Sequence, residues 1–204
     1  MKIYGAPYPA PNPRRVRMYL AEKGITAPYE DVDLQTRGHK APAFVEKNSL
    51  GQVPTMELDD GTVIAESVSI CRYFEALNPE PPLFGATPAQ QANVDMWIRR
   101  IEFQLMGPIG QFWVLSHPLT ARLGEQKFKD YGEANKRRAA NAMKWLNGEI
   151  KDRDFIAGDA FTMADIIAEC TIDFAKFVGI DIPEDCTALI AWRARMKTRP
   201  SFRA

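Results

Sequence analysis

Alternating apolar and polar residues from Met56 onward predict two short strands joined by a tight turn. Met56 and Leu58 alternate with Glu57, which is the two-residue period of a half-buried strand. Asp59-Asp60-Gly61 has hairpin-turn chemistry, because glycine takes a positive φ readily. The β-branched run Thr62-Val63-Ile64 continues as the second strand. This stretch therefore predicts an antiparallel hairpin.

A helix should follow the hairpin. Apolar residues recur there three or four positions apart, which is the spacing of an amphipathic helix. They are Ile70, Cys71, Phe74 and Leu77. Ser67 precedes them and is expected to be the N-cap. Antiparallel pairing brings Val53-Pro54, at one strand's start, close to Glu66-Ser67, at the other's end. One edge of the sheet thus gathers polar and backbone groups that can hold a small ligand.

The first part of the chain alternates strands with helices. Ile3-Tyr4 begins a strand, and a loop with proline at every second position follows at residues 7–13. Arg14 to Lys23 is expected to be a helix, and Tyr29 to Leu34 the second strand. A short helix fits near Ala43-Phe44-Val45. The order β-α-β-(α)-β-β-α predicts an α/β domain with a mixed four-stranded sheet.

A proline-rich stretch at 78–85 separates this part from a helical one. We expect an α/β domain at residues 1–79, a linker at 80–88 and an all-α domain at 89–204. Apolar spacing predicts four helices in that second domain. They run from Val94 to Leu105, from Ala139 to Ile150, from Phe161 to Gly179 and from Cys186 to Lys197. Gly107-Pro108 should interrupt the first of them, and Thr162 and Asp165 have capping-box spacing.

Composition narrows the function classes. The 204 residues contain 26 basic and 26 acidic side chains, so no nucleic-acid or membrane-surface footprint is expected. No apolar run is long enough to span a bilayer, and no signal peptide is evident at residues 1–5. The three cysteines form no CxxC pair. They favour buried thiols in a reducing compartment over a redox or zinc site, so we expect a cytoplasmic protein without a metal.

The element order resembles that of a cytosolic glutathione transferase, in which a thioredoxin-like domain precedes an all-helical one. Gln52-Val53-Pro54 is similar to the family's cis-proline loop, and Glu66-Ser67 to its γ-glutamyl motif. The stretch 158–165 resembles the capping motif of its core helix. His39-Lys40 have the spacing of plant and bacterial classes. The resemblance covers essentially the whole chain. It implies a detoxification enzyme that uses glutathione as co-substrate.

The resemblance also implies how glutathione would be held. Val53, preceding a cis peptide to Pro54, would pair with the cysteinyl unit as a short antiparallel ladder. Ser67 would bind the γ-glutamyl carboxylate at a helix N-terminus. Glu66 would bind the ammonium, and burying it without a cation would be costly. An ordinary trans turn at Val53-Pro54 and a plain N-cap at Ser67 remain the alternatives.

His39 and Lys40 would meet the glycyl carboxylate near Gln52, with Lys40 acting as a flexible point charge. The alternative is that both side chains are solvated surface residues. The residues themselves leave these two interpretations open.

The activating group must stabilise a thiolate. Lowering a thiol pKa of about 8.5 by about two units needs roughly 2.7 kcal/mol of preferential interaction. The serine position of related transferases falls on Ala10, which cannot supply it. Pro11-Asn12 resembles a nu-type subgroup in which an asparagine amide lies beside the sulfur, although Asn12 could also simply cap the helix. Tyr8 and Tyr4 are the second and third candidates.

An electrophile pocket is expected between the domains, lined from the first helix of the second one. Its candidates are Phe103, Leu105, Met106, Phe112 and Trp113. An apolar stripe is more often core, but Phe112-Trp113 should lie beyond the regular part of the helix, which favours the pocket.

The predicted function is addition of glutathione to small apolar electrophiles. The alternatives are glutathione-dependent reduction of disulfides or peroxides, and a non-catalytic glutathione-binding module. The resemblance also implies a homodimer, to which Asp95 and Arg99 could contribute, with a small-molecule electrophile as the other partner.

Overall fold

The structure is a computed structural model that describes residues 1–120 and 128–204. Contacts within the chain divide it into two units, 84–198 and a first unit that joins residues 1–83 to residues 199–204. The first unit thus includes six residues that the sequence-based division assigns to the second domain. The boundaries at 79 and 88 stay a prediction.

The first unit is built on a mixed four-stranded sheet with the order β2-β1-β3-β4. β1 pairs parallel with β2 and antiparallel with β3, which pairs antiparallel with β4. The predicted α/β domain with a mixed sheet is thereby confirmed. The elements are β1 (Lys2–Gly5), α1 (Pro11–Lys23), β2 (Tyr29–Asp31), η1 (Gly38–Lys40), α2 (Pro42–Lys47), β3 (Thr55–Glu57), β4 (Val63–Ala65), α3 (Ser67–Leu77) and η5 (Pro200–Arg203).

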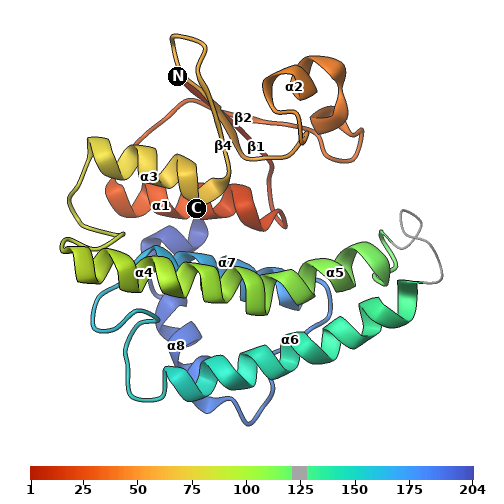
Figure 1. Cartoon of the computed structure of the whole chain (residues 1–204), viewed down its shortest axis with the longest axis vertical. Helices are drawn as coiled ribbons and strands as arrows, with labels where there is room; N and C mark the ends of the chain where they lie inside the picture. The colour runs from red at the N-terminus through yellow and green to blue at the C-terminus, as the bar shows by residue number, and fades with distance from the viewer. Residues whose placement is uncertain (121–127) are drawn as a thin grey trace. The chain divides into compact units, whose positions relative to one another are not determined.

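The two faces of this sheet carry different layers. Ile3 and Met56 are register partners, and both are fully buried. Tyr4 points to the opposite face, where its ring meets Phe44 of α2 edge-on at 6.0 Å. Figure 1 shows α1 and α3 side by side along one face and α2 on the other. The strand period of two residues therefore separates an α1/α3 layer from an α2 layer.

Two boundaries in the first unit differ from the expected ones. β2 ends at Asp31, not Leu34, because the Asp33 carboxylate accepts the backbone N–H groups of Gln35 (2.8 Å) and Thr36 (3.3 Å) and closes a turn. α1 begins at Pro11, not Arg14. Proline has a helical φ and lacks an N–H that the first turn of a helix cannot use, so the proline-rich loop passes into the helix early.

The second unit is helical, as predicted. Its elements are α4 (Pro88–Arg100), η2 (Ile101–Met106), α5 (Gly107–Leu115), α6 (Lys129–Glu149), α7 (Met163–Phe177) and α8 (Thr187–Lys197). α4, the π-helical η2 and α5 follow one another along one rod, with α6 beside α5 (Figure 1). Twelve of the fifteen residues of α7 are buried, so α7 is the core helix of this unit.

The first helix of this unit is interrupted directly before Gly107-Pro108, as expected, but the chain continues as the helix α5. The π-helical turn η2 precedes it, and Pro108 occupies the first turn of α5, where its missing N–H is harmless. Phe112 and Trp113 therefore lie inside a regular helix. The expectation that they lie beyond the regular part was wrong.

A buried capping box begins α7. The side chain of Asp165 is fully buried and accepts the backbone N–H of Thr162 at 2.9 Å, that of Ile156 at 2.9 Å and the indole N–H of Trp192 at 3.0 Å. Burial raises the pKa of this carboxyl to about 6, against the opposing effect of those hydrogen bonds. The predicted capping pair Thr162/Asp165 is confirmed, and it also ties α7 to α8.

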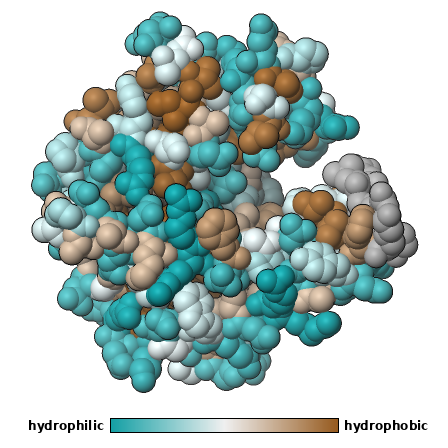
Figure 2. All heavy atoms as spheres, viewed as in Figure 1, coloured by the Kyte–Doolittle hydropathy of each residue, from teal (hydrophilic) through white to brown (hydrophobic). Residues whose placement is uncertain are grey.

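Among the described residues, no helix is both long enough and apolar enough to cross a bilayer. On the face drawn in Figure 2, hydrophobic residues form separate groups amid hydrophilic ones.

Replacing Asp165 with alanine should destabilise the protein by about 2–4 kcal/mol, because it removes a helix cap and leaves buried N–H donors unpaired. Urea unfolding followed by circular dichroism measures the change. The exposed Asp159→Ala is the matched control and should stay within about 0.5 kcal/mol of the wild type. Equal stability of the two variants would contradict a structural role for Asp165.

Candidate functional site

The candidate site lies at the edge of the sheet where β3 begins and β4 ends. Thr55 and Ala65 are register partners. Pro54 and Glu66 each stand one residue beyond that pair, so the loop 52–54 and the start of α3 meet at this edge. The Val53–Pro54 peptide is cis. The structure thus brings together the two motifs that the sequence places 13 residues apart.

Hydrogen bonds hold the loop at 52–54. The Asn48 amide donates to the carbonyl of Gln52 at 2.9 Å and to the hydroxyl oxygen of Thr55 at 3.0 Å. The Thr55 hydroxyl donates to the same Gln52 carbonyl at 2.9 Å. Both side chains are buried. Asn48 and Thr55 are supporting residues that sequence reasoning missed, and a threonine opening a buried strand was the available signal.

His39 and Lys40 lie against the other end of this loop. The Lys40 ammonium donates to the carbonyl of Leu50 at 2.7 Å, and a Cβ atom on Gly51 would lie only 2.6 Å from the His39 carbonyl oxygen. Gly51 has a φ of 54°, so its lack of a side chain permits both the turn and the close approach. Burial, and then the charges of Lys40 and Arg37, lower the pKa of His39. These effects disfavour the charged form of the His39 ring.

Glu66 joins β4 to α3 in an unusual conformation. Its φ of 68° and ψ of 123° make it one of two non-glycine residues with positive φ in the described ranges, and it occupies the N-cap of α3. Ser67 is the first helical residue, so the expectation that Ser67 is the N-cap was wrong. The Glu66 side chain is exposed, which corrects the argument from its burial. Strained backbone of this kind concentrates at functional sites.

A buried arginine stands behind Ser67. Arg15 of α1 is 3% exposed and Ser67 is 4% exposed. The Arg15 guanidinium donates to the Ser67 hydroxyl oxygen at 3.5 Å. The free N–H groups and dipole of the α3 N-terminus add to its positive charge. Together they form a place suited to a carboxylate or other anion. Arg15 is a functional candidate that sequence reasoning missed.

The start of α1 carries the predicted activating residue. Ala10 is the N-cap and has no side chain to cap the helix. Pro11 and Pro13 lack an N–H, so Asn12 supplies the one backbone donor among these first three helical residues. The Asn12 side-chain oxygen is buried and has no hydrogen-bond partner in the described part of the chain. Asn12 is the second helical residue, so its expected alternative role as an N-cap does not hold.

The two tyrosine candidates differ in their surroundings. Tyr8 lies on the proline-rich loop and is 59% exposed. The Tyr4 hydroxyl donates to the Glu57 carboxylate at 2.9 Å. Burial, and then this hydrogen bond, raise the pKa of Tyr4. A phenol so engaged is a poor donor to a second anion.

The expected electrophile residues lie in the second unit. Phe103 is 66% exposed on η2, whereas Leu105 and Phe112 are 1% and 5% exposed and belong to the core. Met106 is half-buried. The Trp113 ring contacts those of His117, Phe174 and Phe177 at 4.7, 5.6 and 5.9 Å. These residues therefore do not share one environment.

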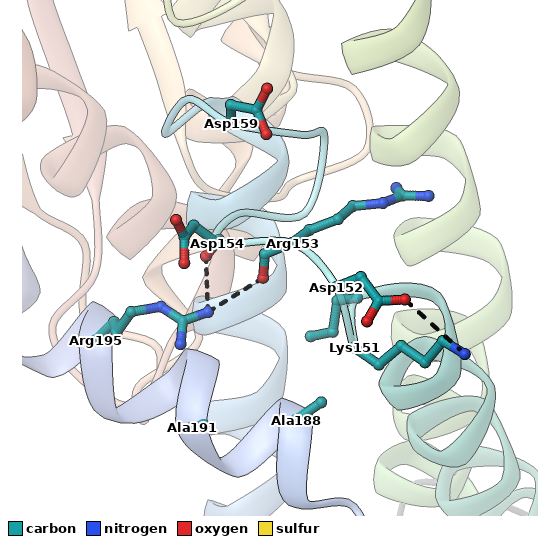
Figure 3. A pocket seen from close by; sticks show the side chains of 9 residues that line it. Lys151, Asp152, Arg153, Asp154, Asp159, Ala188, Ala191 and Arg195 are labelled. Carbon is teal, nitrogen blue, oxygen red and sulfur yellow. Dashed lines mark hydrogen bonds and ion pairs between the residues drawn. The ribbon is translucent and has the colours of Figure 1, made fainter.

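A cavity of about 270 Å³ opens elsewhere in the second unit, between the loop 151–159 and α8 (Figure 3). Arg195 there donates to the carbonyl oxygens of Arg153 (3.4 Å) and Asp154 (2.9 Å), and Lys151 pairs with Asp152 at 3.9 Å. Arg195, Lys151 and Asp152 therefore make these contacts with the loop 151–159 itself. The sheet edge of the first unit remains the better candidate site.

The chain thus joins a thioredoxin-like α/β unit, whose cis-proline loop lies beside a helix N-terminus, to a helical unit. Residues 10–77 match the model of the glutathione S-transferase N-terminal domain, and residues 106–200 that of its C-terminal domain. The chain belongs to the glutathione S-transferase family.

Individual relatives agree with this assignment. Glutathione S-transferase 2 of Saccharomyces cerevisiae is 37% identical over an alignment 209 positions long, which covers the whole chain and 88% of the relative. The crystal structure of yeast Gtt2 superposes with a TM-score of 0.91 at 36% identity, covering 100% of this chain and 99% of that one. A glutathione S-transferase domain-containing protein from Marinobacter aquaeolei gives 0.90 at 39% identity, covering 98% and 99%.

Glu66→Gly should be more stable than Glu66→Ala by about 1 kcal/mol. Glycine relieves the strain of the positive φ, and this gain exceeds the extra conformational entropy that glycine loses on folding. Both variants remove the same exposed side chain, so the difference isolates the backbone. Urea denaturation of the two variants measures it. A glycine variant no more stable than the alanine variant would show that position 66 is unstrained.

Proposed function

We propose that this protein is a glutathione transferase that binds glutathione, stabilises its thiolate and adds it to small apolar electrophiles. Membership of the family supports this proposal. The observation that carries it is the buried Arg15–Ser67 contact at the N-terminus of α3, beside the cis-proline loop. Such a site suits a ligand that offers a carboxylate at one end and an extended peptide backbone next to it.

Glutathione fits these groups in one orientation. The γ-glutamyl carboxylate would lie on the Ser67 hydroxyl and the α3 N-terminus, with its ammonium on the exposed Glu66 carboxylate. The cysteinyl unit would pair with the backbone of Val53. The glycyl carboxylate would then reach the end of the loop where Gln52, His39 and Lys40 lie. This order places the charged ends of the tripeptide at opposite ends of the 52–54 loop.

Asn12 is the residue that we propose for thiolate stabilisation. It offers a backbone N–H and a side-chain amide at the positive end of α1, and amide nitrogen and oxygen can exchange places to suit an anion. Tyr8 ranks second. Tyr4 ranks last, because its hydroxyl already serves Glu57.

We further propose that Phe103, Met106 and Trp113 receive the electrophile, since exposed or half-buried apolar side chains can accept a ligand and the core residue Phe112 can support them. We also propose a homodimer. Asp95 and Arg99 form an i,i+4 pair at 3.7 Å on α4 and would contribute to the contact with a second copy.

The proposal is tested by titrating the protein with glutathione in a calorimeter and then assaying an aromatic halide and a small disulfide as substrates. Binding with turnover of the halide supports the transferase. Turnover of the disulfide alone would favour the reductase alternative, and binding without turnover would favour a non-catalytic module. Absence of binding would refute the proposed function.

Ser67→Ala should raise the dissociation constant for glutathione about 10- to 100-fold, because one hydrogen bond to a charged group is lost. Calorimetric titration measures the constant. Ser69→Ala, an exposed change two residues further along α3, is the matched control and should bind like the wild type. Equal affinities of the two variants would remove Ser67 from the site.

Asn12→Ala should lower kcat about 10- to 100-fold and leave glutathione affinity nearly unchanged, because it removes a donor to the thiolate alone. Steady-state kinetics with a varied concentration of glutathione separates the two effects. If Asn12→Ala keeps its activity and Tyr8→Phe abolishes it, Tyr8 is the activating residue.

A further inference from the structure

Helix α1 begins with charges of the wrong sign for its dipole. Arg14, Arg15 and Arg17 lie within its first seven residues, and its first turn contains no acidic residue. The N-terminus of a helix already carries a partial positive charge, which anions stabilise and cations destabilise. Arg14 and Arg15 are also buried. The start of α1 therefore depends on acceptors supplied by other parts of the chain.

Each of these arginines has such an acceptor. Arg15 donates to the Ser67 hydroxyl oxygen of α3, and Arg17 to the carbonyl of Ala6 at 2.8 Å. Arg14 donates to the carbonyl of Phe202 at 2.8 Å, and its guanidinium lies 4.9 Å from the centre of the Phe202 ring. The acceptor for Arg14 thus comes from residues 199–204, which we call the return segment.

The return segment also binds the C-terminal end of α1. Arg199 donates through two nitrogens to the two carboxylate oxygens of Glu22, at 2.8 and 2.6 Å, and the buried Ser201 hydroxyl donates to the same carboxylate. Burial would raise the pKa of Glu22, but the hydrogen bonds from Arg199 and Ser201 leave it below its ordinary value. A bidentate pair of this kind fixes orientation as well as charge. Figure 1 shows the C-terminal end beside α1.

The two contacts, Phe202 with Arg14 and Arg199 with Glu22, lie near opposite ends of α1. Arg14 and Glu22 are eight residues apart, which is about 12 Å along a helix axis. The return segment therefore runs antiparallel to α1. Arg199 lies at the last turn of α1, and Phe202 lies near the first turn of α1. Arg14 is the sequence neighbour of Arg15 and stands two residues from Asn12. The contact of Arg14 with Phe202 therefore fixes the part of α1 that carries both residues proposed to meet glutathione.

We propose that the return segment is a positioning element of the glutathione site, which holds the first turn of α1 so that Arg15 and Asn12 face the ligand. This inference rests on the proposed function. None of the residues of the segment needs to touch glutathione. The segment acts through α1, so a substitution in the segment should change the affinity for glutathione.

Arg199→Gln breaks the bidentate pair and should raise the dissociation constant for glutathione about 5- to 10-fold. Arg199→Lys, which keeps a charge for Glu22, should recover part of that loss. Lys2→Gln is the matched control, since it removes an ion pair of the same unit, to Glu30, that does not involve α1. Its affinity should equal that of the wild type.

The titrations are run well below the unfolding midpoint of every variant. If the return segment had a purely structural role, Arg199→Gln would lower the free energy of unfolding but leave the dissociation constant for glutathione unchanged, because the folded fraction stays near one. A change in affinity at full folding is therefore specific to positioning. An unchanged dissociation constant for Arg199→Gln, with the wild type binding glutathione, overturns this inference and leaves the proposed function intact.

Binding is reciprocal, so glutathione should in turn steady the segment. The backbone N–H groups of Phe202 and Ala204, which donate to Arg199 and Ser201, should exchange with deuterium more slowly when glutathione saturates the wild type. Exchange rates unaffected by glutathione would count against the coupling. Failure of the wild type to bind glutathione at all would overturn both proposals.

Discussion

The contact between Arg15 and Ser67 is the interaction on which the site depends. It places a buried guanidinium behind the first residue of α3, where the helix already presents free N–H groups and a partial positive charge. A buried cation is costly unless an anion or several acceptors meet it. The edge of the sheet between Pro54 and Glu66 is therefore electrostatically prepared for a carboxylate, and the strained backbone of Glu66 is the local cost of shaping it.

That contact draws the rest of the first unit into the site. Arg15 stands on α1, and α1 is held from three directions: by α3, by the loop after β1 and by residues 199–204. Two of these links join an arginine of α1 to a segment distant in sequence, and the third joins Arg17 to Ala6 in the loop just before the helix. The arginines that weaken α1 as an isolated helix are the same groups that assemble the unit. The binding edge is thus supported by separate hydrogen bonds that all end on α1.

Much of the fold could be predicted from the sequence because local patterns specify it. The hairpin at 55–65, the helix from Ser67 and the capping pair Thr162/Asp165 follow from spacing and turn chemistry over a few residues. The misses share another cause. That Glu66 and not Ser67 caps α3, and that Phe112 stays within a regular helix, depend on backbone conformations that residue types do not determine. Arg15 and the return segment were missed because their partners lie 52 and 188 residues away.

The central claim is that a carboxylate of glutathione binds at the start of α3. Calorimetric comparison of glutathione with an analogue that lacks only the α-carboxylate of its γ-glutamyl unit tests it directly. The loss of two charge-assisted hydrogen bonds predicts an affinity about 100-fold weaker or more, and an analogue lacking the glycyl carboxylate should lose less. Equal affinities for glutathione and the first analogue would contradict the account.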